Sequence, residues 1–258
     1  MTSSGKSFKN SFAFSETSGD VIFSKDTVVI QPKKGYRFNS DSMILSWFIY
    51  NTLIENEIRT SLEIGAGTGV ISIVLKKRGF KSQITCVEVQ KEMFSLLSEN
   101  ITNNTLSNDL LPIHEDFRIF ADNTKKQFDL IFSNPPFFGI TTGKTNENST
   151  KALCRHEFLG NLNDFFVSST KILKKNGHFI FVYPISRIQH ALSCAKNCNL
   201  ILKNICFFRE NSSVAPSSFT AHLVYKSSES SSFPELITMK DETGEYSQIG
   251  KKIMYYQN

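Results

Sequence analysis

Three glycines at alternate positions, Gly65, Gly67 and Gly69, follow the acidic Glu63 within residues 62–71. Apolar residues precede and follow them, and this pattern predicts a strand, a tight turn and the start of a helix. Glycine is needed where φ is positive, or where a ligand approaches the backbone too closely for a Cβ atom. Such a turn presents free N–H groups at a helix N-terminus, where they can bind a polar or anionic ligand.

The spacing of the glycines distinguishes kinds of nucleotide-binding loop. Dinucleotide-binding proteins carry G-x-G-x-x-G, whereas residues 65–69 carry G-x-G-x-G. No Lys followed by Ser or Thr comes after the glycines, which excludes a phosphate-binding P-loop. The pattern resembles the cofactor loop of Rossmann-like S-adenosylmethionine (SAM) methyltransferases. A glycine-rich turn without a ligand is the alternative.

Two later apolar runs also end in polar residues. Residues 84–88 end at Glu88, which follows Gly69 by 19 positions (88 − 69). An acidic side chain about 20 positions after such a loop reaches the hydroxyls of a ribose. Residues 128–133 lead into the tetrad Asn134-Pro135-Pro136-Phe137. The tetrad resembles the signature of methyltransferases that act on exocyclic or amide nitrogens.

Strand and helix patterns alternate from residue 61 to residue 183, which predicts an α/β fold. We expect a mostly parallel twisted sheet with right-handed crossovers and helices on both faces. Ligands of such sheets bind beyond the carboxyl ends of the strands. Gly65–Gly69, Glu88, Asp116 and Asn134 all fall at predicted strand ends, so we expect them to converge.

The segment before this unit has its own pattern. Short β-type runs at residues 21–23 and 27–30 predict a hairpin. An apolar helix is predicted at residues 43–50, with Ser40 or Asp41 as its N-cap.

Composition limits the class of protein. The chain of 258 residues has a net charge of +5, a basic excess that suits a polyanionic partner without requiring one. Five cysteines without a C-x-x-C pair favour reduced thiols in a cytoplasmic protein over disulfides or a zinc site. No signal peptide or apolar run approaching 18 residues is present. We expect a small N-terminal extension (1–58) packed on a core domain with a C-terminal tail (59–258).

With these residues placed, the chain resembles the bacterial family of tRNA1(Val) adenine-N6 methyltransferases. The resemblance covers nearly the whole chain and rests on residues 37–45, 63–69, 134–138, 155–157 and 244–247. It implies a Rossmann-like, class I SAM-dependent methyltransferase, here acting on the anticodon-loop adenine 3′ of the anticodon of tRNA(Val). We also expect a monomer or weak dimer that needs neither metal nor membrane.

The resemblance assigns roles to residues of this sequence. The catalytic residues would be Asn134, Pro135, Pro136 and Phe137. The cofactor-binding residues would be Arg37, Asp41, Glu63, Gly65, Ala66, Gly67, Thr68, Gly69, Glu88, Val89, Asp116, Phe117 and Asn134. The Asn134 side-chain oxygen and the Pro135 carbonyl would accept the two amine hydrogens, and Phe137 would stack on the base.

We expect electrostatic attraction to dominate the contact with RNA. A polar loop without apolar periodicity is predicted at residues 139–150, and the sequence leaves open whether it closes over the substrate. The candidate contacts are Lys33, Lys34, Lys144, Lys151, Arg155, Arg187 and Arg209. Taken alone, each of them fits a solvated charge better than an RNA contact.

Other functions remain open at this point. The same tetrad would serve a methyltransferase on rRNA guanine-N2 or on a protein glutamine amide. An inactive Rossmann-like RNA-binding module is the non-enzyme alternative. An intact Asn134-Pro135-Pro136 and Glu88 count against it.

Overall fold

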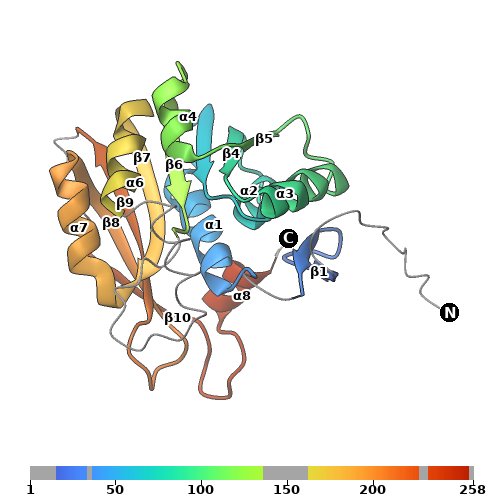
Figure 1. Cartoon of the computed structure of the whole chain (residues 1–258). Coiled ribbons are helices and arrows are strands. Elements are labelled where there is room, and N and C mark those ends of the chain that lie inside the picture. The colour runs from blue at the N-terminus through green and yellow to red at the C-terminus, as the bar shows by residue number, and fades with distance from the viewer. Residues whose placement is uncertain (1–15, 34–36, 136–161, 227–231, 256–258) are drawn as a thin grey trace, which may run out of the picture.

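The computed structural model describes residues 16–33, 37–135, 162–226 and 232–255, and its centre is an eight-stranded sheet (Figure 1). The strand order is β10-β8-β9-β7-β6-β3-β4-β5. The strands are β3 (Thr60–Ile64), β4 (Gln83–Glu88), β5 (Leu110–His114), β6 (Phe128–Ser133), β7 (Leu173–Pro184), β8 (Leu200–Arg209), β9 (Ser218–Tyr225) and β10 (Glu235–Thr238). Only β9 pairs antiparallel with its described neighbours, β7 and β8. The predicted mostly parallel α/β sheet is therefore confirmed.

Helices cover both faces of the sheet (Figure 1). One face packs against α1 (Ser40–Leu53), α2 (Val70–Lys77), α3 (Lys91–Asn103) and α8 (Gln248–Met254). The other packs against α4 (Phe117–Asn123), α6 (Leu162–Ile172) and α7 (Ile188–Asn197), the last preceded by the 3₁₀ turn η1 (Ile185–Arg187). Because both faces are buried, central strands are continuously apolar, as at residues 179–183 of β7.

The predicted N-terminal hairpin is confirmed with shifted ends, as β1 (Thr17–Val21) and β2 (Val28–Pro32) pair antiparallel. The prediction that Ser40 or Asp41 caps the next helix is wrong. Asn39 is the N-cap of α1, and its side-chain oxygen accepts a hydrogen bond from the Asp41 backbone N at 3.1 Å. Asn39 has the extended backbone of a cap, whereas Ser40 already belongs to the first helical turn.

The described cysteines carry free thiols, as expected from their spacing: these are Cys86, Cys194, Cys198 and Cys206. Burial raises the pKa of the Cys206 thiol to about 12, so this group stays protonated at neutral pH. Within the described ranges, no helix combines the length and the apolar character needed to cross a bilayer.

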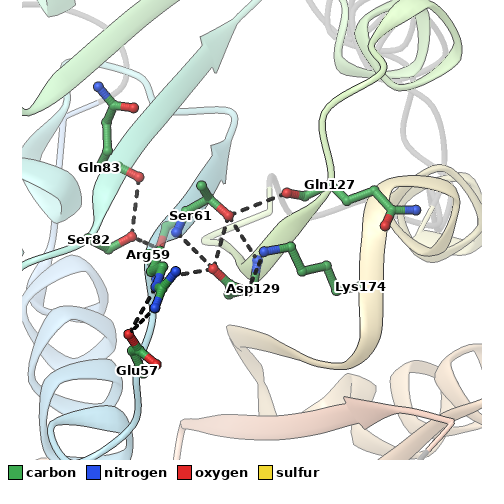
Figure 2. Close-up of polar contacts among 9 residues, drawn as sticks. Glu57, Arg59, Ser61, Ser82, Gln83, Gln127, Asp129 and Lys174 are labelled. Carbon is green, nitrogen blue, oxygen red and sulfur yellow. Dashed lines mark hydrogen bonds and ion pairs between the residues drawn. The ribbon is translucent and has the colours of Figure 1, made fainter.

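A single carboxylate joins three strands at the edge where the parallel strands begin (Figure 2). Asp129 of β6 accepts hydrogen bonds from the backbone N atoms of Arg59 and Thr60, at 3.1 and 2.9 Å. Its other oxygen lies 2.6 Å from the Lys174 ammonium at the start of β7. Burial alone would raise the pKa of Asp129, but the bonds from Lys174 and Thr60 outweigh it and lower the pKa below 3.8.

Replacing this carboxylate should destabilise the sheet. We expect Asp129→Ala to lower the free energy of unfolding by about 2 kcal/mol, because it removes several hydrogen bonds to one charged group. The measurement is urea denaturation at neutral pH. The matched control is Asp122→Ala, since Asp122 forms an exposed ion pair with Lys171 and should change stability by less than about 0.5 kcal/mol. Equal effects of the two substitutions would contradict the structural role of Asp129.

Candidate active site

The glycine loop connects β3 to α2 at the carboxyl edge of the sheet. Gly65, Gly67 and Gly69 all have positive φ, at 67°, 58° and 86°. A Cβ atom on Gly69 would lie 2.6 Å from Cδ1 of Leu97, so a larger residue there meets both strain and a clash. Gly65 is exposed, and a Cβ atom on it would meet no atom of the described chain within 4 Å. The loop is therefore open to a ligand at Gly65 and tightly packed at Gly69.

The predicted acidic residue at the end of β4 is bonded to this loop. One Glu88 carboxylate oxygen accepts a hydrogen bond from the Gly67 backbone N, and the other from the Gln90 backbone N, both at 2.8 Å. Glu88 is only 4% exposed. Burial raises the pKa of Glu88, against the opposing effect of these hydrogen bonds. Glu88 thus fixes the distance between the glycine loop and the end of β4.

A buried amide holds the other side of the loop. The Asn100 side-chain nitrogen donates to the carbonyl oxygens of Thr68 and Ile30, at 3.0 and 2.9 Å. The Asn100 oxygen accepts from the Ile30 backbone N at 2.7 Å. Asn100 has no exposed surface, so its three bonds fix β2 of the hairpin against the glycine loop.

A pocket opens at this edge of the sheet. Its described lining residues are Phe38, Ser42, Gly65, Ala66, Gly67, Thr68, Val70, Ile71, Met93 and Asn134. Four residues of the predicted cofactor loop therefore share one pocket with Asn134, the first residue of the predicted tetrad. The Ser133 hydroxyl donates to the Ile64 carbonyl at 2.8 Å and joins the ends of β6 and β3. This bond brings Asn134 beside the loop.

Five lining residues were missed by the sequence analysis: Phe38, Ser42, Val70, Ile71 and Met93. Phe38 precedes the N-cap of α1, Ser42 lies in the first turn of α1, and both line the pocket. They belong to the segment that resembles the family, but its charged members Arg37 and Asp41 were selected instead. Met93 of α3 carried no signal beyond helical apolar periodicity.

The charged residues of that segment have other partners. The Arg37 guanidinium lies 2.7 Å from an Asp20 carboxylate oxygen and donates to the Pro32 carbonyl at 3.2 Å, which fixes it to the β1–β2 hairpin. The Asp41 carboxylate accepts from the Asn39 amide at 2.9 Å. Burial raises the pKa of Asp41, opposed by bonds from Asn39 and Ser218. The structure brings neither residue to the glycine loop through a described contact.

Glu63 lies beneath the loop. It is 1% exposed, and one carboxylate oxygen accepts a hydrogen bond from the Ser72 hydroxyl of α2. Its other oxygen has no hydrogen-bond partner in the described part of the chain. Burial raises the pKa of Glu63 to about 8. Glu63 therefore supports the packing of α2 on β3.

Asp116 and Phe117 begin α4. Asp116 is the N-cap, and its carboxylate accepts from the Arg118 backbone N at 2.8 Å and from the Arg118 guanidinium. Burial alone would raise the pKa of Asp116, but the bonds from Arg118 outweigh this effect and lower the pKa. The Phe117 ring packs on Phe165 with centroids 4.6 Å apart. The Val89 carbonyl oxygen lies 3.1 Å from Nε2 of His114.

The described basic candidates for RNA contact differ in their surroundings. Lys33 forms an exposed ion pair with Glu16 at 3.4 Å. Arg209 donates to the Thr238 hydroxyl at 2.8 Å and joins β8 to β10, which is a structural role. Arg187 lies in η1. Predictions that fall outside the described residues are those for Lys34, Pro136, Phe137, Lys144, Lys151, Arg155 and the segment 139–150.

The arrangement combines the backbone of the glycine loop, a buried carboxylate bonded to that loop and an amide in one region of the structure. The sequence profile of the methyltransferase small domain family matches residues 44–203, more than half of the chain. The chain belongs to this family. It is a methyltransferase with the class I methyltransferase fold, as expected from the glycine loop and the sheet.

Curated relatives carry a more specific name. A protein of Flavobacteriaceae bacterium (strain 3519-10) is 26% identical over 74% of this chain and 78% of its own length. A protein of Haemophilus influenzae (strain PittEE) is 32% identical over 55% of this chain and 62% of its own length. A protein of Pedobacter heparinus is 28% identical over 62% of this chain and 65% of its own length. All three are named tRNA1(Val) (adenine(37)-N6)-methyltransferase. The match thus spans less than two thirds of two of these relatives.

Solved structures support the fold. A predicted O-methyltransferase, Atu636 from Agrobacterium tumefaciens, superposes with a TM-score of 0.63 at 13% identity, over 83% of this chain and 94% of that one. The 16S rRNA N2 G1207 methyltransferase RsmC of T. thermophilus, solved with AdoMet and guanosine, superposes with a TM-score of 0.56 at 14% identity. It covers 81% of this chain and 50% of the RsmC chain.

The burial of Glu63 makes stability depend on pH. The folded protein keeps this carboxyl protonated up to about pH 8, whereas the unfolded chain loses the proton near pH 4.5. The stability tied to this group is fully present below pH 4.5 and is lost as the pH rises toward 8. We expect Glu63→Gln to flatten this decline, which can reach about 1.4 kcal/mol per pH unit.

The measurement is the free energy of unfolding of wild type and Glu63→Gln from pH 5 to pH 8. The matched control is Glu92→Gln at an exposed position, which should keep the wild-type pH dependence. A Glu63→Gln profile that falls as steeply as the wild-type profile would show that Glu63 is ionised in the folded protein.

Proposed function

We propose that this chain transfers a methyl group from SAM to the exocyclic N6 amine of an adenine in tRNA. The observation that carries the proposal is one pocket lined both by residues 65–68 of the glycine loop and by Asn134. The names of the curated relatives favour adenine in the anticodon loop of tRNA(Val) as the substrate.

The cofactor half of the proposal follows from the loop. SAM supplies an activated methyl group on a sulfonium when it is bound. The open surface at Gly65 fits a ligand that touches the backbone. The N–H groups of Gly65, Ala66 and Gly67 already donate within the chain, so the remaining N–H groups at the turn into α2 would face the methionine carboxylate. Glu88 would accept the ribose hydroxyls with the lone pairs that its two backbone bonds leave free. Val89, Asp116 and Phe117 would line the adenine side.

The substrate half depends on Asn134. The lone pair of an adenine amine is delocalised into the ring, so the enzyme must orient the nitrogen toward the methyl group. The Asn134 side-chain oxygen and the Pro135 carbonyl would accept its two hydrogens. Pro135 is buried, which would hold its carbonyl in a fixed position. Pro136 and Phe137 would complete the site, with Phe137 stacked on the flipped base.

The N-terminal segment would belong to the same working unit. We propose that residues 1–58 extend the methyltransferase domain, residues 59–258, and shape its cofactor side. Asn100 favours this role, because it bonds to the hairpin at Ile30 and to the glycine loop at Thr68.

The proposal is tested by methyl transfer from labelled SAM to unmodified tRNA, followed by nucleoside analysis. We expect label in N6-methyladenosine with the wild type. Asn134→Ala should lower kcat by about 100-fold, the effect typical of removing one preorganised polar group from a reaction site. SAM affinity should change much less than kcat.

The matched control is Asn123→Ala, an exposed position at the end of α4, which should leave kcat unchanged. Label in N2-methylguanosine, or label on protein glutamine but not on tRNA, would refute the proposed substrate. Failure of the wild type to bind SAM would favour an RNA-binding module.

A further inference from the structure

A second pocket lies at the opposite end of α1, on the same face of the sheet. Its volume is about 850 Å³. Its described lining residues are Thr52, Leu53, Asn56, Lys175, Asn176, His178, Lys203, Asn204, His222, Val224, Lys226 and Ser232. Ser42 lines the first pocket and Thr52 the second, ten residues apart (52 − 42), or about 15 Å along the helix. The second pocket is therefore separate from the proposed methyl-transfer site.

The lining of this pocket is basic. Lys175, Lys203 and Lys226 line it, and none of its described lining residues is Asp or Glu. The neighbouring Lys174 is turned to Asp129 in an ion pair (Figure 2). A concave site lined by one sign of charge concentrates ligands of the opposite sign. The pocket therefore favours an anion.

A buried histidine pair forms one wall of the pocket. Nδ1 of His178 lies 2.8 Å from Nε2 of His222. His222 is 4% exposed, and its Nδ1 has no hydrogen-bond partner among the described residues. Burial lowers the pKa of His222 to about 3, so the ring is neutral at physiological pH. When Nε2 accepts from His178, Nδ1 carries the ring proton and is a donor without a partner.

A bulge in β8 turns two consecutive side chains into the same pocket. The pairing of β8 with β9 shifts between Leu202 and Asn204, which leaves Lys203 as the extra residue. In a regular strand Lys203 and Asn204 would point to opposite faces, yet both line this pocket. The buried Asn204 side-chain oxygen also has no partner in the part of the chain that the structure describes. Asn204 therefore offers an acceptor on the strand position paired with His222, whose Nδ1 is a donor in the tautomer described above.

We propose that this pocket binds a ribose phosphate. The phosphate would interact with Lys175, Lys203 and Lys226 and accept a hydrogen bond from Nδ1 of His222. A sugar hydroxyl would donate to the Asn204 oxygen, the one buried acceptor without a partner among the described lining residues. The volume lies in the range of small-molecule sites. The same chemistry is present in an RNA backbone and in a free nucleotide.

The test is a titration with D-ribose 5-phosphate, followed by the imidazole NMR signals of the full chain. We expect saturable shifts of the His178 and His222 signals and none of the exposed His190 signal. Lys175→Ala/Lys226→Ala removes two exposed lysines and should weaken binding at least about tenfold. The control Lys125→Ala/Lys126→Ala removes two exposed lysines elsewhere and should bind like the wild type.

A second arm identifies the source of the phosphate. If it is an RNA backbone, Lys175→Ala/Lys226→Ala should also weaken tRNA binding more than the control pair does, and flatten its salt dependence. Equal tRNA binding by the two variants, with ribose 5-phosphate binding weakened, would identify a free nucleotide as the source. The proposal is overturned if ribose 5-phosphate shifts neither histidine, or shifts both equally in the variant. Neither arm requires methyl transfer, so failure here and failure of the proposed function are distinguishable.

Discussion

The hydrogen bond from the Gly67 backbone N to the Glu88 carboxylate is the contact on which the candidate site depends. It connects the turn after β3 to the end of β4, and it exists because the two strands are parallel and end at the same edge. Two further bonds, from the Gly65 and Ala66 backbone N atoms to the Val87 carbonyl, hold the rest of the turn. A loop fixed in this way presents its remaining polar groups in one arrangement before any ligand arrives, and preorganisation of this kind lowers the cost of binding.

The same parallel arrangement explains why the chemistry lies where it does. Ser133 joins β6 to β3 and places Asn134 beside the loop, while Asp129 joins the opposite ends of the same strands. β3 and β6 are therefore joined at both of their ends. Because helices cover both faces of the sheet, the candidate site lies at the carboxyl ends of the strands. Methyl transfer from an activated donor needs orientation more than acid–base chemistry. In the proposed mechanism, the loop and the amide that share one pocket would supply that orientation.

The sequence alone predicted the parts of the fold that local patterns determine. Alternating strands and helices indicated the parallel sheet, and the glycine spacing located the loop because positive φ requires glycine there. Glu88 was selected because it ends an apolar run 19 positions after Gly69, and the structure bonds it to the glycine loop, while its role toward a ribose stays a prediction. The N-cap of α1 was not predictable, because Asn39, Ser40 and Asp41 are all residue types that cap helices. The partner of Arg37 was not predictable either, because Asp20 lies on β1, distant in the sequence. The second pocket carried no sequence signal, since it depends on a bulge that brings Lys203 and Asn204 to one face.

The most direct test of the site is equilibrium binding of SAM by calorimetry, comparing wild type, Glu88→Ala and the exposed control Glu92→Ala. The wild type should bind one SAM per chain. Glu88→Ala should raise Kd at least about tenfold, because it removes both the ribose acceptor and the bond that shapes the loop. Glu92→Ala should bind like the wild type. Failure of the wild type to bind SAM, or equal affinity in all three proteins, would contradict the assignment of the cofactor to the glycine loop and Glu88.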